Sequence, residues 1–205
     1  MNYRHDIRFA GEGGQGVVTG GIVLAEAASV YEGRNVVMTQ AYAAQQRGGP
    51  ARAEIIISDD QIDYPKVLEA DVLLALNQDA YDRYHHQMKR DGIIIVESAR
   101  VGGEVADHVS VLKIPLEEIS CQVAGSKLSA NFVALGVISG LKGIVGPRAL
   151  RAALEARVSR ASKESNLKAL KAGVLVGKYM KKGKIISPID LKQETDGQNA
   201  CRENT

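Results

Sequence analysis

The feature that most constrains the fold of this sequence is a glycine-rich turn placed between an apolar strand pattern and a helical pattern. The turn spans Gly11–Gly16, follows the alternating run Ile7–Ala10 and opens a helical pattern at Val17. Glycine lets the backbone turn sharply and lets an anion approach the backbone N–H groups. The first N–H groups of a helix and its dipole both favour negative charge. This order therefore predicts a phosphate-binding turn, with these candidate residues: Gly11, Gly13, Gly14, Gln15 and Gly16.

One part of a dinucleotide-binding turn is missing. Such domains carry an acidic residue about 20 residues further on, where the second strand ends, to bind a ribose hydroxyl. Here the second strand is predicted over Asn35–Met38, and Thr39, Gln40 and Ala41 follow it. Two interpretations stay open: a phosphate group on the turn, or a turn whose glycines only let strand and helix pack closely.

Apolar runs separated by helical patterns predict the fold class. Runs such as Ile55–Ile57 are continuous, which is typical of strands buried on both faces of a parallel sheet. We expect an α/β, Rossmann-like, doubly wound and mostly parallel sheet with one hairpin-like or edge departure, and a helical C-terminal portion. One domain should span residues 1–192, with a polar, disordered tail over 193–205. The predicted strands are 7–10, 35–38, 51–58, 70–76, 92–96 and 109–114; the predicted helices are 15–31, 79–89, 116–123, 128–141, 149–158 and 162–180.

Composition excludes several classes of function. With 205 residues, a formal charge of +2 and no Trp, the chain shows no sign of a nucleic-acid-binding or membrane-surface protein. No signal-peptide pattern opens it, and its longest near-apolar run, Phe132–Val145, is short for a membrane span. Cys121 and Cys201 lie far apart, so they cannot hold an iron–sulfur cluster by themselves. A reducing cytoplasm is the expected location.

The loop after the second strand carries a second candidate site. It is polar and ends in glycines, and its only charge is Arg47, a side chain suited to phosphate or carboxylate. The alternative is a solvated loop arginine. The candidate residues added by this loop are Arg47, Gly48 and Gly49.

Catalytic and metal sites are not predicted. The sequence holds no nucleophile elbow and no H-E-x-x-H motif. His85 and His86 are adjacent on a predicted helix, so their side chains diverge by about 100° and do not form a metal pair. Asp59 and Asp60 suit a turn better than a metal site.

The motifs taken together resemble the gamma subunit of 2-oxoacid:ferredoxin oxidoreductases, a family that includes the pyruvate, 2-oxoglutarate and ketoisovalerate enzymes. The resemblance covers about residues 5–180 and is more specific than the glycine turn alone. The segments that carry it are Gly11–Gly16, Arg47–Gly49, Ile56–Asp59, Ile62–Pro65, Asn131–Gly136 and Asn166–Ala169.

The resemblance implies that the cofactors and the catalytic steps belong to other subunits of a complex. The family's complexes decarboxylate a 2-oxoacid oxidatively to an acyl-CoA and reduce ferredoxin. Thiamine diphosphate, magnesium and iron–sulfur clusters are then expected on partner subunits: alpha, beta and, in some complexes, a ferredoxin-like delta. The gamma chain packs beside the active site and is expected to contact coenzyme A.

One departure from the family pattern leaves the substrate open. Many gamma subunits have Tyr-Gly-Pro-Glu in this loop, whereas the chain has Tyr42-Ala43-Ala44-Gln45, and Gln46-Arg47 resembles the indolepyruvate enzymes. The segment Ile62–Pro65 favours 2-oxoglutarate or a general 2-oxoacid. The alternatives are a stand-alone dinucleotide-binding oxidoreductase and a purely structural assembly subunit.

Overall fold

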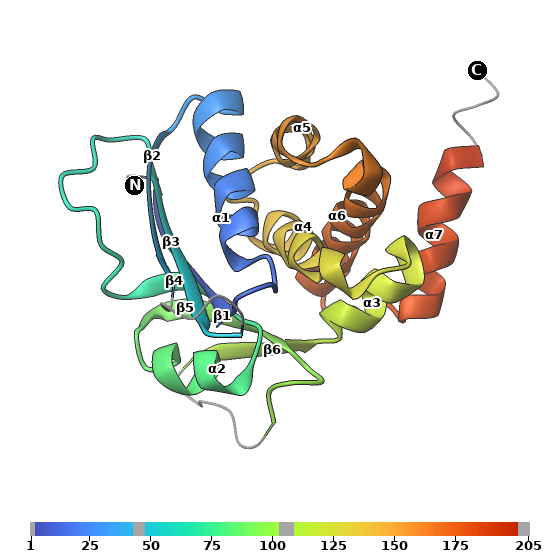
Figure 1. The fold of residues 1–205 in the computed structure, drawn as a ribbon, viewed down its shortest axis with the longest axis horizontal. Coiled ribbons are helices and arrows are strands. Elements are labelled where there is room, and N and C mark those ends of the chain that lie inside the picture. The colour runs from blue at the N-terminus through green and yellow to red at the C-terminus, as the bar shows by residue number, and fades with distance from the viewer. Residues whose placement is uncertain (1–2, 43–47, 103–108, 201–205) are drawn as a thin grey trace. The chain divides into compact units, whose positions relative to one another are not determined.

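The computed structural model describes residues 3–42, 48–102 and 109–200 (Figure 1). Arg47 and Cys201, both considered from the sequence, lie outside the described residues. The chain divides into two compact units, Met1–Pro115 and Leu116–Thr205, which are described in turn. A single domain over 1–192 stays a prediction.

The first unit is built on a six-stranded sheet with the order β2-β3-β1-β4-β5-β6. β1 pairs in parallel with β4, β4 with β5 and β5 with β6, whereas β3 runs antiparallel to both β1 and β2. The prediction of a mostly parallel α/β sheet is therefore confirmed. Its hairpin-like departure is β3, which lies inside the sheet between β2 and β1 and not at an edge. The strands are β1 Arg4–Glu12, β2 Asn35–Tyr42, β3 Pro50–Ser58, β4 Ala70–Ala75, β5 Met88–Glu97 and β6 Ser110–Ile114.

Two helices of this unit pack on opposite faces of the sheet. Successive side chains of a strand point to opposite faces, so the strand residues near each helix identify the face that it covers. Helix α1 (Val17–Glu26) packs on the face that holds Ala53. A Cβ added at Gly21 would come within 2.8 Å of the Ala53 Cβ, so this glycine permits the close approach of helix and sheet. Helix α2 (Gln78–Tyr84) packs on the other face, where Arg8 is directly opposite Glu54.

The first helix ends where the sequence predicts. It continues beyond α1 as a π-helical turn over Ala27–Tyr31, and Gly33 (φ 70°) follows it, as expected of a residue just past a helix end. The second helix differs from the prediction: it was predicted over 79–89 but ends at Tyr84. Met88 begins β5 because it is buried and pairs with Ala70, so period-2 sheet pairing overrides the helical pattern there.

A charged cluster ties three strands together at the amino ends of β1, β4 and β5. The Lys89 ammonium lies 2.8 Å from both the Asp6 and the Asp71 carboxylates. Burial disfavours the ammonium charge, but hydrogen bonds and Coulombic attraction from these carboxylates outweigh it, so the pKa of Lys89 is raised above its ordinary value. The backbone N–H of Asp6 also donates to Asp71, at 2.7 Å.

We expect the contribution of this cluster to stability to disappear at high pH. Because the pKa of Lys89 is higher in the folded chain, the stabilisation is present below the unfolded value of about 10.4 and is lost as pH rises through the folded value. With about a third of the Lys89 side chain exposed, Lys89→Met should cost no more than about 1 kcal/mol at pH 8. Urea unfolding of the wild-type and Lys89→Met proteins at pH 8 and pH 11 measures this difference in the free energy of unfolding. The exposed Lys66→Met is the control, and an effect of Lys89→Met that persists at pH 11 would contradict the expectation.

The second unit is helical. Its long helices α4 and α6 pack with backbone against backbone at four glycines, because a Cβ on any of them would meet main-chain atoms of the other helix: Gly136, Gly140, Gly173 and Gly177. All side chains of α4 from Ala130 to Ser139 are buried. The helices are α3 Leu116–Ala124, the short 3₁₀ turn Lys127–Ser129, α4 Ala130–Lys142, α5 Pro147–Arg157, α6 Arg160–Lys181 and α7 Pro188–Ala200.

The start of the predicted disordered tail is helical. Residues 193–200 belong to α7, and two hydrogen bonds fix this helix to α6: Tyr179 donates to Glu194 at 2.6 Å, and Lys171 to the Thr195 carbonyl at 2.8 Å. The polar composition of residues 193–205 predicted disorder, but composition carries no information about these two hydrogen bonds to α6.

No single helix in the described ranges is long and apolar enough to cross a membrane. Only Leu116–Ala124 and Lys127–Lys142 taken together, bent by 118°, reach that length and composition.

Candidate functional site

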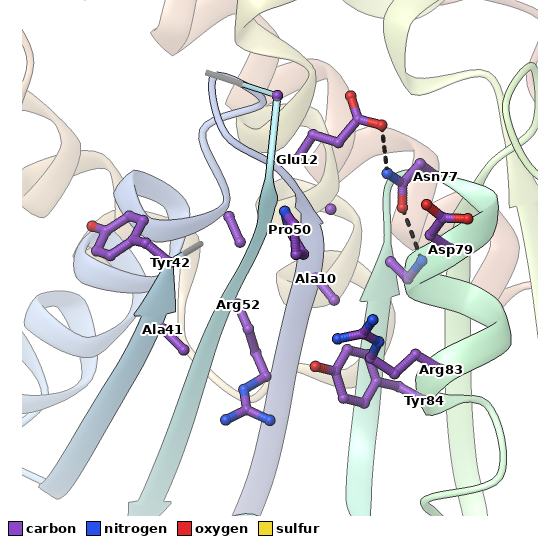
Figure 2. Close-up of a pocket in the computed structure, with 14 residues that line it drawn as sticks. Ala10, Glu12, Ala41, Tyr42, Pro50, Arg52, Asn77, Asp79, Arg83 and Tyr84 are labelled. Atoms are coloured by element: carbon purple, nitrogen blue, oxygen red, sulfur yellow. Dashed lines mark hydrogen bonds between the residues drawn. The ribbon is translucent and has the colours of Figure 1, made fainter. Parts of the chain in front are cut away.

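A cleft of about 400 Å³ opens at the carboxyl edge of the sheet in the first unit (Figure 2). It is lined by the ends of β1 and β2, by the start of β3 and by α2. The start of β3 reaches this edge because β3 runs opposite to its neighbours. Here the chain leaves β1 towards β2 on one side, while β4 and β5 lie on the other. In open α/β sheets, ligands bind at such a reversal of strand order.

The cleft has basic and acidic groups on different elements. Arg52 comes from β3, and Arg83 comes from the last turn of α2, next to Tyr84; all three line the cleft (Figure 2). The Arg52 guanidinium lies 5.8 Å from the centre of that ring and 3.9 Å from Glu54. The carboxylates are Glu12 at the end of β1 and Asp79 in the first turn of α2.

Asn77 joins the glycine turn to α2. Its side-chain NH₂ group donates to Glu12 Oε1 at 2.9 Å, and its side-chain oxygen Oδ1 accepts from the Ala80 N–H at 2.9 Å. The second bond is an N-cap, which fixes where α2 begins. This buried side chain therefore sets the position of α2, and with it the position of Arg83 and Tyr84, relative to the end of β1.

The glycine turn uses several of its own N–H groups inside the protein. Glu12 N–H donates to the Gln15 side chain at 2.7 Å, Gly13 N–H to the Gly49 carbonyl at 2.8 Å, and Gln15 N–H to the Glu12 carbonyl at 3.1 Å. A Gly13 N–H that points at an anion, as the sequence suggested, is thus not found. The turn needs its glycines for conformation, since Gly14 has φ 98° and Gly16 has φ 73°.

The structure brings only part of the predicted site to the cleft. Gly11 and Gly48 line it, whereas Gly13, Gly14, Gln15, Gly16 and Gly49 are not among its lining residues. Arg47 is outside the described residues, so its ligand role stays a prediction, as does the cofactor-binding role of the glycine turn. The hydrogen bond from Gly13 to Gly49 shows that the turn and the second loop do meet.

A buried ion pair lies below the cleft on the α2 face. Arg8, with its side chain 2% exposed, donates to Glu54 at 2.8 Å, to Gln87 at 2.8 Å and to the Val67 carbonyl at 2.6 Å. The Arg8 guanidinium also lies 4.9 Å from the centre of the Tyr84 ring. Arg8 and Arg52 therefore both contact Tyr84, one from the sheet interior and one from the cleft.

Sequence reasoning missed the charged side chains of the cleft and the ion pair below it. Signals for both were present in the sequence: Arg8 and Glu54 are opposite charges within two apolar strand patterns, and Arg83 was counted only as part of a helix. Pairing register, which puts Arg8 opposite Glu54 and Ala10 opposite Arg52, was needed to bring them together.

Within the described ranges, no group of three or more His, Cys, Asp or Glu side chains could hold a metal ion. The His85 and His86 rings are nearly perpendicular, at 87°, and His85 stacks on Tyr81 instead. Cys121 is a free, partly buried thiol.

Known proteins that are similar to this chain are oxidoreductase subunits. The family of pyruvate ferredoxin/flavodoxin oxidoreductases matches residues 6–176. The chain is 36% identical to the 2-oxoglutarate synthase subunit KorC of Methanocaldococcus jannaschii, covering 88% of this chain and 97% of that one. It is 34% identical to the ketoisovalerate oxidoreductase subunit VorA of Methanothermobacter marburgensis, but spans only 35% of that protein.

Solved structures agree in fold. The gamma subunit of the keto/oxoacid ferredoxin oxidoreductase from Geobacter sulfurreducens is similar with a TM-score of 0.76 and 36% identity, over 84% of this chain and 95% of that one. The 2-oxoglutarate:ferredoxin oxidoreductase from Magnetococcus marinus shares the fold, with a TM-score of 0.74 and 24% identity over 85% of this chain and 31% of that one. The resemblance seen in the sequence is confirmed: the chain belongs to the pyruvate ferredoxin/flavodoxin oxidoreductase family, among its gamma-type members.

Proposed function

We propose that this chain is the gamma subunit of a multi-subunit 2-oxoacid:ferredoxin oxidoreductase, which converts a 2-oxoacid and coenzyme A to an acyl-CoA and CO₂ and reduces ferredoxin. The observation that carries the proposal is the match over 97% of a 2-oxoglutarate synthase subunit. Because the match extends over nearly the whole length of such a subunit, we expect this chain to act as one subunit of the complex and not as a whole enzyme.

The chemistry must then come from partner subunits. We assign thiamine diphosphate, magnesium and the iron–sulfur clusters to alpha, beta and ferredoxin-like delta chains, with ferredoxin as the acceptor. The two cysteines are 80 positions apart in sequence, at 121 and 201, and a four-cysteine cluster needs more ligands than they supply. A cytoplasmic location belongs to the same proposal, because two cysteines that lie far apart in the sequence fit a reducing compartment.

The proposed substrate is 2-oxoglutarate. Relatives named as 2-oxoglutarate synthase subunits match at 36–40% identity over at least 94% of their length. The common gamma subunit of the pyruvate/ketoisovalerate oxidoreductases from Pyrococcus abyssi is 28% identical. Rates of the assembled complex with 2-oxoglutarate, pyruvate and 2-oxoisovalerate test this choice, and a clear preference for either of the last two would overturn it.

Contact with coenzyme A is the part of the function proposed for this chain itself. The Magnetococcus marinus enzyme, which shares the fold, was solved with 2-oxoglutarate, coenzyme A and succinyl-CoA bound. In the present chain, the cleft at the carboxyl edge of the sheet is a suitable place, and two residues predicted from the sequence, Gly11 and Gly48, line it.

The isolated chain is expected to show no 2-oxoacid oxidation, even with thiamine diphosphate and coenzyme A supplied. Co-purification with its partner subunits should restore coenzyme A-dependent ferredoxin reduction, measured by the absorbance of ferredoxin or of a viologen dye. A stand-alone dinucleotide-binding oxidoreductase would instead turn over without partners and bind NAD. A purely structural subunit would leave coenzyme A kinetics unchanged whichever cleft residue is altered.

A further inference from the structure

We propose that the outer edge of β2 is an interface at which two copies of this chain pair, antiparallel, into one continuous sheet. The partner is therefore a second copy of the chain. This interface goes beyond the proposed function, because it involves a different edge of the sheet from the cleft and does not depend on the substrate. Three features of β2 support it: its open edge, its lack of charge and the apolar side chains at its two ends.

The first support is the open edge itself. β2 is the outermost strand of the sheet and pairs with β3. Within the described residues, no main-chain hydrogen bond joins β2 to any other element. Because the N–H and C=O groups of a strand point alternately to its two sides, about half of those in this eight-residue strand point away from the sheet. Another strand can bind them there.

The second support is the composition of the strand. Natural sheets protect their edges with short strands, charged side chains or proline. The opposite edge of this sheet follows that rule, because β6 has five residues, carries Lys113 and is followed by Pro115. β2 is longer, and Asn35–Tyr42 contains neither a charged side chain nor proline. Such an edge favours pairing with a second strand.

The charges next to the start of β2 indicate what kind of strand fits. Arg34 binds Asp59 at 3.0 Å and Glu32 at 3.5 Å, and its guanidinium lies 3.4 Å from the centre of the Tyr3 ring. These charges are thus engaged with one another and do not call for a charged partner. An uncharged strand is the best fit, and β2 itself is uncharged.

Symmetry restricts the register of such a pair. Two antiparallel copies are related by a two-fold axis normal to the sheet, so each side chain stays on its own face. Opposite residues of an antiparallel pair share a face, so they must lie an even number of positions apart in the sequence. A pair centred on Thr39 satisfies this rule. It places Val36 opposite Tyr42 of the second copy, and Met38 opposite Gln40.

The third support is that this register joins exposed apolar side chains. Met38 faces α1, because its Cε would lie 2.9 Å from a Cβ added at Gly21, so Val36 and Tyr42 face α1 by alternation. Tyr42 is 61% exposed, and Val30, in the π-helical turn that leads into β2, is 68% exposed. Pairing brings Tyr42 of each copy to the start of β2 in the other, beside Val36 and Val30. Each exposed apolar end therefore gains an apolar neighbour.

A cysteine at the centre of the pair tests the register. With Cys121→Ser and Cys201→Ser in the full chain, Thr39→Cys should give a disulfide-linked dimer on a non-reducing gel after mild oxidation. Opposite Cα atoms of an antiparallel pair are about 4.5–5.5 Å apart, which a disulfide can span. Asn35→Cys is the matched control on the same strand. The two copies of this more exposed position would be roughly 25 Å apart, so it should not cross-link.

A charge on the edge tests the association. Gln40→Lys should raise the dissociation constant of the dimer about tenfold or more in sedimentation over a concentration series, because it places a charge beside Met38 of the second copy. The control is Ser110→Lys, at an exposed position of the other edge strand, which should leave the constant unchanged. Val30→Ser should also weaken the dimer. Leu128→Ser, at a 78% exposed position of the second unit, should not.

The inference is overturned if Thr39→Cys cross-links no more than Asn35→Cys, or if Gln40→Lys and Ser110→Lys sediment alike. A strand of another subunit on β2 gives a different pattern, which also overturns it. The wild-type chain would then be monomeric, and Gln40→Lys would lower the yield of the assembled complex. Failure of the proposed function is separate, because these measurements need neither substrate nor partner subunits.

Discussion

Replacing Gly173 by alanine is expected to destabilise the second unit by about 2 kcal/mol or more, although alanine is the better helix former by about 1 kcal/mol. The added Cβ would meet the carbonyl group of Val133, with its carbon at 2.8 Å, and the Cα of Gly136 at 3.0 Å. These are main-chain atoms of α4, so no side chain can rotate away. The two helices must separate, and the buried contacts along α4 loosen with them.

Urea unfolding followed by far-UV circular dichroism measures the loss. Gly102→Ala is the control, because no heavy atom of the described residues lies within 4 Å of the added Cβ and its φ is not in the left-handed region. It should stay within a few tenths of a kcal/mol of wild type. If Gly173→Ala proved as stable as Gly102→Ala, the close approach of α4 and α6 would not be a requirement of the fold.

The fold could be predicted to a large extent because hydrophobic patterning encodes it directly. Runs such as Ile55–Ile57 are buried on both faces, and the glycine turn follows β1 as its position before a helix implied. The errors came where a tertiary partner decided the outcome. Met88 belongs to β5 because Ala70 is its partner, and residues after Gln193 are helical because α6 supplies hydrogen bonds to them.

The candidate site was less predictable because it depends on register and on helix orientation. The sequence directed attention to glycines and to one loop arginine, since those residues form a known local motif. Arg52 and Arg83 come from a strand and a helix more than 30 positions apart, and only the antiparallel pairing of β3 brings them to one edge. No periodicity within a single segment carries that information.

The second large effect is expected from removing one member of the buried pair below the cleft. Glu54→Leu should cost about 3–5 kcal/mol, because it leaves the Arg8 guanidinium buried without a carboxylate. Its remaining partners, Gln87 and the Val67 carbonyl, are neutral. Arg8→Met should cost less, because the Glu54 carboxylate retains Arg52 at 3.9 Å and the Thr39 hydroxyl at 3.4 Å.

The double variant Arg8→Met/Glu54→Leu separates burial of a charge from loss of packing. Replacing a whole buried pair by apolar side chains is often nearly neutral, so the double variant should recover most of the stability lost in Glu54→Leu. Glu164→Leu, which removes an exposed partner of Lys168, should leave the urea midpoint unchanged. If the double variant is as unstable as Glu54→Leu, then packing and not an unpaired charge determines the loss. If it is stable but binds coenzyme A weakly, the pair serves chiefly to hold Tyr84 at the cleft, because Arg8 is the interior contact of that ring.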